Sequence, residues 1–133
     1  MLSGVEASLK CIVDDYYPWI LYQMVNKYFS SKLKIIKTIS HQIHEEAEGA
    51  MDYAKMAVHY KEEYPELARA YAEMAEQELG HANRLHDFVV KFISKVRETA
   101  TPPKWMLEMW EEEHKEIIEE VAKTKAMIAM IQR

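Results

Sequence analysis

The stretch AEMAEQELGHANRLHDF, residues 72–88, decides the fold, because its apolar residues recur every three or four positions. That period is typical of a helix with one apolar face turned toward a core. Glu78 and His81 lie within this apolar stripe, although the burial of an unpaired carboxylate is costly. Residues three apart lie about one turn apart along a helix. The stretch therefore predicts a helix that aims a carboxylate and an imidazole at one point.

Four segments of the chain show the same helical period, and no segment shows the alternation of a strand. Short breaks are expected at Ser30–Lys32, near Glu63–Tyr64 and at 97–104, and Pro18 predicts a kink or break in the first segment. The expected helices span about residues 5–29, 33–62, 65–96 and 103–131. We predict a single all-α domain, residues 1–133, folded as an antiparallel four-helix bundle with up-and-down connectivity.

The composition and charge exclude several classes of protein. The net charge is -5 and no basic cluster occurs, so binding to nucleic acid is not expected. No apolar run approaches the roughly 20 residues that span a membrane, and the N-terminus lacks the pattern of a signal peptide. A single cysteine cannot form an internal disulfide. We therefore expect a cytoplasmic protein that binds neither nucleic acid nor a membrane.

Acidic and histidine side chains interrupt the apolar stripes near the middle of three segments. If the second and third segments form a hairpin, Glu46 precedes the turn by about 17 residues, and Glu78 and His81 follow it by about 14–17 residues. These three residues should therefore meet at one level. Carboxylate oxygens and imidazole nitrogens suit iron, manganese or zinc, and carboxylates that bridge two ions suit iron or manganese. The hairpin predicts a metal site.

The last segment repeats the Glu-x-x-His spacing at Glu111 and His114 but fits this level less well. A tight antiparallel turn after residue 102 would misalign this pair by roughly 18 Å from the pair on the third segment, at about 1.5 Å per residue. Either the third helix ends early, near Ile93, and an extended segment leads to the last helix, or the last helix completes the site of a neighbouring subunit.

These residues resemble the metal-binding motif of the ferritin-like superfamily, on its rubrerythrin and bacterioferritin side. The resemblance covers about Ile36–Phe92 and, more loosely, Trp105–Ile128. Members carry one Glu on the first helix and Glu-x-x-His on the second, and a second half supplies another such set, so that two metal ions are bound. The resemblance implies five ligands of a dinuclear iron centre, with manganese as an alternative metal: Glu46, Glu78, His81, Glu111 and His114.

Two further residues enter through the resemblance. The remaining carboxylate of the family has no match between the third and last segments, and Asp14 or Asp15 on the first segment could supply it, with Asp15 the better placed. Alternatively, the first segment takes no part in metal binding and two chains assemble a symmetric site. Tyr53, seven residues after Glu46, matches a tyrosine common in the family. It is either an electron donor, a hydrogen-bond partner of a bridging carboxylate, or a core aromatic.

The resemblance implies oxidation of Fe(II) by oxygen or peroxide, that is, ferroxidase or peroxide-detoxifying activity. The sequence holds no rubredoxin-type cysteine cluster, so an electron path would need a separate donor protein. It also lacks the extra C-terminal helix of large ferritin cages, which favours a homodimer or small homo-oligomer, or cargo within another shell. Two other interpretations stay open. One is a structural or protein-interaction bundle with a partial, inactive metal motif, and the other is metal binding without turnover.

Overall fold

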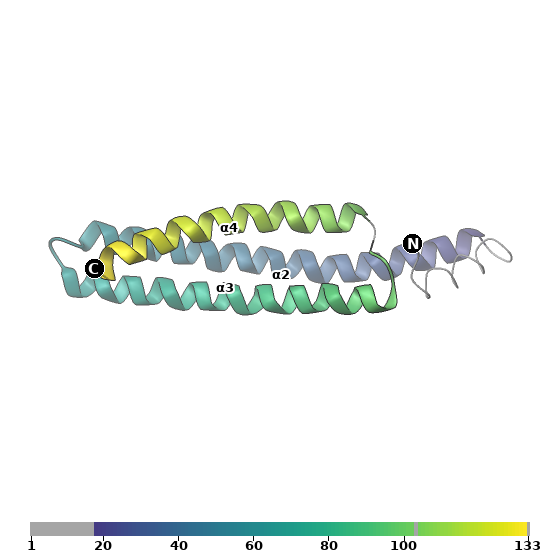
Figure 1. Cartoon of the computed structure of the whole chain (residues 1–133), viewed down its shortest axis with the longest axis horizontal. Coiled ribbons are helices and arrows are strands. Elements are labelled where there is room, and N and C mark those ends of the chain that lie inside the picture. Colours follow the sequence, from purple (N-terminus) through teal and green to yellow (C-terminus); the bar gives the residue numbers. More distant parts are fainter. Residues whose placement is uncertain (1–17, 103, 133) are drawn as a thin grey trace.

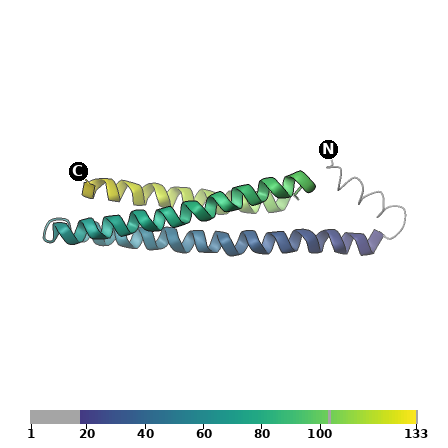
Figure 2. The same ribbon diagram turned by 90° about the horizontal axis from the view of Figure 1, so that it is seen from below.

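The computed structural model describes residues 18–102 and 104–132, with side chains from Lys27 onward, and this part of the chain forms three α-helices and no strand. The helices are α2 (Pro18–Tyr60), α3 (Pro65–Thr99) and α4 (Lys104–Gln132). α2 and α3 form a long antiparallel hairpin, and α4 returns in the direction of α2 (Figures 1 and 2). The all-α class is therefore confirmed, whereas the expected four-helix bundle is not, because the described residues form three helices.

α2 runs without interruption through Ser30–Lys32, so the predicted break there is wrong. Serine and lysine lower helix stability only slightly, unlike glycine or proline. Phe29 and Ile36 are both buried, and a continuous helix keeps these two side chains in the same core. Pro18 is the first described residue of α2, so the predicted kink or break at this proline falls at the edge of the described residues. Residues 5–17 of the predicted first helix lie outside the described residues.

A tight connection makes α2 and α3 antiparallel neighbours. The N–H of Tyr64 donates to the carbonyl of Tyr60 at 2.8 Å, and the N–H of Ala68 donates to the carbonyl of Tyr64 at 2.9 Å. Pro65 occupies the first position of α3, as predicted, because its fixed backbone angle suits a helix start. The position of this turn fixes which residues of the two helices lie side by side.

Two groups of buried apolar side chains hold the helices together. At the end near the start of α4, large side chains from all three helices pack together, among them Ile36, Val89 and Met106. At the hairpin end, five buried alanines of α2 and α3 pack with Ile128 and Ile131 of α4. Small side chains let helix backbones approach closely, which keeps the two long helices in register. The candidate ligands lie between these two groups along the hairpin.

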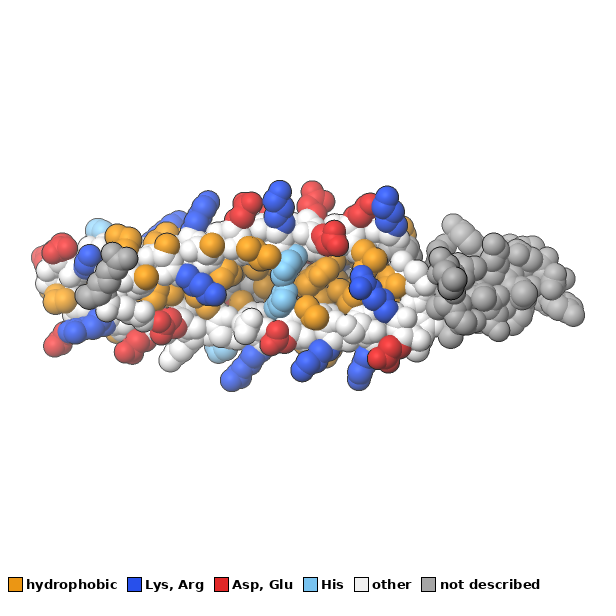
Figure 3. Space-filling model, viewed as in Figure 1, with side chains coloured by type: hydrophobic (Ala, Val, Ile, Leu, Met, Phe, Trp, Pro, Cys, Tyr) orange, Lys and Arg blue, Asp and Glu red, His pale blue; other side chains and the backbone are white. Residues whose placement is uncertain are grey.

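α4 packs mainly against α2 and leaves a groove of about 540 Å³ between itself and α3. His86 and His114 line this groove together with apolar side chains such as Ile117 and Val121. Histidine side chains amid hydrophobic ones are visible between the two helices in Figure 3. Within the described residues, no helix is both long and apolar enough to cross a membrane.

Gly80 offers a test of the helical packing of α3. A Cβ atom built at Gly80 would meet no atom within 4 Å, so the position has room for a side chain. Glycine in a helix interior is about 1 kcal/mol less favourable than alanine. We expect Gly80→Ala to raise the free energy of unfolding by about 1 kcal/mol, as measured by urea denaturation. A fall in stability would show that Gly80 faces a neighbour that the described residues do not include.

Candidate metal centre

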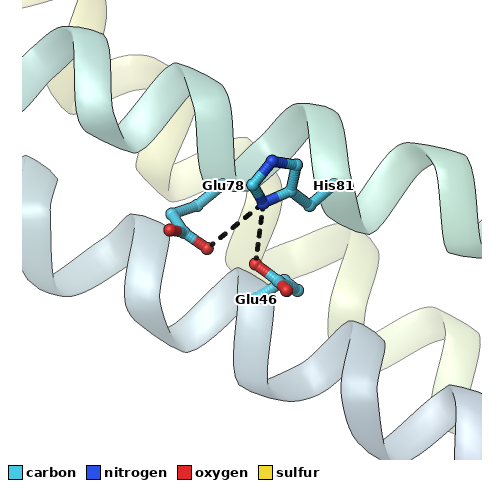
Figure 4. Close-up of side chains that lie close together, drawn as sticks. All are labelled: Glu46, Glu78 and His81. Atoms are coloured by element: carbon cyan, nitrogen blue, oxygen red, sulfur yellow. Dashed lines mark hydrogen bonds and ion pairs between the residues drawn. The ribbon is translucent and has the colours of Figure 1, made fainter.

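The middle of the hairpin brings a carboxylate of α2 against a carboxylate and an imidazole of α3 (Figure 4). His81 Nδ1 lies 3.3 Å from Glu46 Oε2 and 3.8 Å from Glu78 Oε2. One ligand atom from each of the three residues lies within 4.8 Å of the other two. The structure thus places these three predicted residues at one level, as the register of the hairpin required.

The three side chains lie at the surface of the hairpin, and not in the core between the helices. Glu46 is 30% exposed, Glu78 is 28% exposed and His81 is 54% exposed. In Figure 4 the ribbon of α4 passes behind α2 and α3, and the three side chains are on the near side. α4 contributes no residue to the group. The site therefore opens to solvent on a face of the hairpin that α4 leaves uncovered.

The two carboxylates disturb one another. The pKa of Glu78 is raised, first by its hydrogen bond with Glu46, then by partial burial and by the negative charge of Glu46, while His81 acts in the opposite direction. Two carboxylates at this distance resist being charged together unless a proton or a cation lies between them. A divalent cation would remove this penalty. The donor set of two carboxylates and one imidazole fits iron or manganese and leaves coordination positions open.

The second predicted pair lies elsewhere. The first of the two alternatives for the last helix, in which the third helix ends near Ile93, is wrong, because α3 continues to Thr99 and α4 begins at Lys104. His114 therefore lies beside His86, with ring centroids 4.5 Å apart, and not beside the ligands on α3. Glu111 is exposed, and neither it nor His114 belongs to the group of possible ligands.

The other predicted site residues divide into two kinds. Asp14 and Asp15 lie outside the described residues. Tyr53 is half-buried two helical turns from Glu46, and its ring stacks on that of Tyr71 at a centroid distance of 6.1 Å. Tyr71 precedes Glu78 by the same seven residues, so the stacked pair lies on the hairpin-turn side of the candidate ligands.

His86 is the residue that the sequence analysis missed. It stacks on both His114 and Trp110, the latter at a centroid distance of 5.8 Å. The sequence does contain a pattern that indicates a partly buried position for His86. Leu79, Ala82 and His86 follow one another at helical spacing, on a face of the helix distinct from that of the candidate ligands. The stripe of α3 is therefore wider than one line of residues, and one edge of it faces α4.

The His114 imidazole should make stability depend on pH. Its Nδ1 is buried without a hydrogen-bond partner among the described residues. Its pKa is lowered from 6.5, mainly because burial disfavours the charged ring and further because of His86. The unfolded chain then binds a proton more readily than the folded chain, so the contribution of His114 to stability is complete above pH 6.5 and is lost as the pH falls through the lowered pKa.

We therefore expect the free energy of unfolding to fall between about pH 7 and pH 5.5, and to fall less in His114→Gln. Denaturant titrations at the two pH values measure this difference. The control is His41→Gln, because His41 is exposed and pairs with Glu45 at 3.2 Å on α2. An unchanged pH dependence in His114→Gln would contradict the assignment.

Comparison with known proteins adds one finding. The family model described as Rubrerythrin matches residues 37–131. The match starts within α2, includes the whole of α3 and ends one residue before the end of α4, so it contains Glu46, Glu78 and His81. Neither the curated proteins nor the solved structures include a match to the chain. The ligand spacing, the helical hairpin and the family match agree, and the chain belongs to the rubrerythrin family of the ferritin-like superfamily.

Proposed function

We propose that this protein is a di-iron carboxylate protein that oxidises Fe(II) with oxygen or peroxide. The observation that carries the proposal is the convergence of Glu46, Glu78 and His81 in a chain of the rubrerythrin family. The family typically binds iron, and the donor set suits this metal. Two crowded carboxylates give the hairpin a negative centre that a cation would neutralise.

Each residue has a proposed task. Glu46 and Glu78 would hold the metal through carboxylate oxygens, and the Nδ1 atom of His81, which faces both carboxylates, would supply the nitrogen ligand. Bound iron would supply the electron that oxygen or peroxide accepts. The hydrogen bond with Glu46 and partial burial raise the pKa of Glu78, so cation binding would compete with protons for this carboxylate, and the partial exposure of the site connects it to water. The anionic ligands favour the more highly charged Fe(III) product over Fe(II).

Tyr53 is the proposed electron donor to the centre. It lies about 10 Å along α2 from Glu46, at 1.5 Å per residue, and stacks on Tyr71. Tyr71 in turn stacks on Tyr60 at a centroid distance of 6.2 Å. These aromatic rings extend from the neighbourhood of the ligands toward the turn between α2 and α3. An external donor protein would supply further electrons there.

The activity can be tested through the imidazole ligand. Fe(II) added anaerobically and then mixed with oxygen or hydrogen peroxide should be oxidised faster with the protein than without it. We expect the protein-dependent rate of Fe(II) oxidation to fall at least about tenfold in His81→Ala, because a missing ligand weakens the binding of the metal and exposes it to solvent. His41→Ala is the matched control, since His41 also pairs with a glutamate on the same hairpin but lies at a fully separate, exposed position.

One observation favours a second function, a structural or interaction bundle that has kept only part of the motif. Glu111 is exposed and His114 stacks on His86, so a single chain supplies only three of the expected ligands among its described residues. Under this alternative, purified protein would carry no iron, and wild type and His81→Ala would give the same rate of Fe(II) oxidation as buffer. Metal analysis of the anaerobically purified protein separates the two functions.

A further inference from the structure

The candidate ligands lie within an exposed apolar stripe on α3. Leu67, Met74, His81 and Phe88 follow one another at intervals of seven residues. Seven residues make nearly two turns, so these side chains line one face of the helix. Leu67 is 42% exposed, Met74 is 39% exposed and Phe88 is 50% exposed. His81 therefore occupies the centre of a hydrophobic line that faces solvent.

α2 carries a matching stripe beside it. Ile35 is 39% exposed and precedes Glu46 by eleven residues, slightly more than three turns, so the two side chains lie on one face. Tyr28 precedes Ile35 by seven residues and is also 39% exposed. Beyond the ligand, Met56 is 36% exposed and follows Ile35 by three such intervals, although Gln42 and Gly49 occupy the positions between them. We call the surface formed by these two stripes the hairpin face, and its exposed hydrophobic residues are Tyr28, Ile35, Met56, Leu67, Met74 and Phe88.

α4 does not cover the hairpin face. It packs against other residues of α2, as shown by Ile43 and Ile117 in one core group and by the buried Thr124, whose Oγ1 lies 3.7 Å from Met51 Sδ. The apolar residues of the hairpin face lie on both sides of the ligands along the helices. Exposed apolar residues at intervals of seven on α3, beside further exposed apolar residues on α2, are typical of a surface that packs against other helices.

The metal site on this face supplies half of the protein ligands of a dinuclear centre. One chain offers two carboxylates and one imidazole there, and the most exposed of the three, His81, is directed away from the core of its own chain. A two-fold axis through the site would bring a second identical set to the same point. The sum is four carboxylates and two imidazoles, whose four negative charges balance two divalent cations. The ligands that α4 fails to provide would then come from the partner copy.

We propose that a second copy of this chain packs on the hairpin face about a two-fold axis through Glu46, Glu78 and His81, and that both copies together form one dinuclear metal site. The same operation places the apolar residues on either side of the ligands against those of the partner. Without metal, the two carboxylate pairs repel one another across the axis, so metal binding and association strengthen each other. The metal part of this inference rests on the proposed function, whereas the docking of the two copies on the apolar stripes does not.

The test measures association and metal content together on the full chain. Sedimentation velocity with and without anaerobic Fe(II) gives the dimer dissociation constant, and metal analysis gives the iron content. We expect a dimer that binds one Fe(II) per chain and associates more tightly with Fe(II) than without it. Phe88→Glu should raise the dissociation constant at least about 100-fold and weaken Fe(II) binding with it, because a buried charge would lie opposite an apolar partner. Met74→Glu, on the other side of the ligands, should do the same.

Ile118→Glu is the matched control, because Ile118 is 53% exposed but lines the groove between α3 and α4. It should leave the dimer intact. Circular dichroism establishes that each variant is folded. A monomer that holds Fe(II) would overturn the inference and leave the proposed function standing. A dimer that dissociates only in Ile118→Glu would move the interface to the groove and overturn it as well. A dimer that binds no Fe(II) would refute both the shared site and the proposed function.

Discussion

Glu78→Gln should lower the affinity for Fe(II) by roughly 100-fold or more and should leave the metal-free protein at least as stable as the wild type. Loss of residues that merely support a metal ligand costs about 10–100-fold in affinity, so loss of a ligand itself should reach the upper end or exceed it. The amide keeps the size of the side chain but removes the charge that a cation needs. Anaerobic Fe(II) titration followed by calorimetry measures the affinity.

The stability half of this prediction follows from the pKa of Glu78. Because that pKa is raised from 4.5, the folded chain holds a proton more readily than the unfolded chain. Stability therefore falls as the pH rises from 4.5 through the raised pKa, and the charged carboxylate is a small net cost to the metal-free protein at neutral pH. Glutamine removes that cost. Since the site is partly open to solvent, which screens the charges, the gain should be below about 1 kcal/mol.

Glu73→Gln is the control for this experiment, because Glu73 is an exposed acid on the same helix and lies outside the group of possible ligands. It should bind Fe(II) like the wild type. If Glu78→Gln instead destabilises the metal-free protein and keeps its Fe(II) affinity, then Glu46, Glu78 and His81 form an ordinary surface ion-pair cluster.

Ile36→Ala should cost about 2–5 kcal/mol of the free energy of unfolding. Ile36 is 0% exposed and belongs to the core group in which all three helices meet. Removal of three carbon atoms there leaves a cavity, and the long neighbouring helices cannot collapse into it without shifting several other contacts. A small domain has a total stability of about 5–15 kcal/mol, so this single change would remove a large part of it. Denaturant unfolding followed by circular dichroism measures the change.

The control for this change is Ile118→Ala, in which the same atoms are removed from a side chain that is 53% exposed. It should cost less than about 1 kcal/mol, because little apolar surface returns to water. Equal costs at the two positions would show that the core does not close around Ile36 as described.

The helices could be predicted from the period of the apolar residues, but their joins could not. Ser30–Lys32 carries neither glycine nor proline, and a pause in the apolar pattern there does not end α2. α2 stays continuous there because Phe29 and Ile36 pack against the same core, and such packing depends on the tertiary structure. The turn at 61–64 was predictable because Pro65 marks the start of α3.

Half of the candidate site could be predicted from the sequence because it depends on one short turn. Once the turn is placed, counting residues along α2 and α3 brings Glu46 to the level of His81, and these side chains lie 3.3 Å apart. The level of Glu111 and His114 depends on how far α3 continues and on which side α4 packs. The spacing of residues in the sequence determines neither the end of α3 nor the side on which α4 packs. The contact between His114 and His86 is therefore visible only in the structure.

The central claim is that Glu46, Glu78 and His81 bind iron in a site that two chains share. Crystals of the protein loaded anaerobically with Fe(II) test it most directly, through anomalous diffraction at the iron absorption edge. We predict two adjacent iron atoms on a two-fold axis, bound by these three residues from each chain. Iron bound elsewhere, such as at His86 and His114, or a complete site within one chain, or no iron at the hairpin face, would contradict the claim.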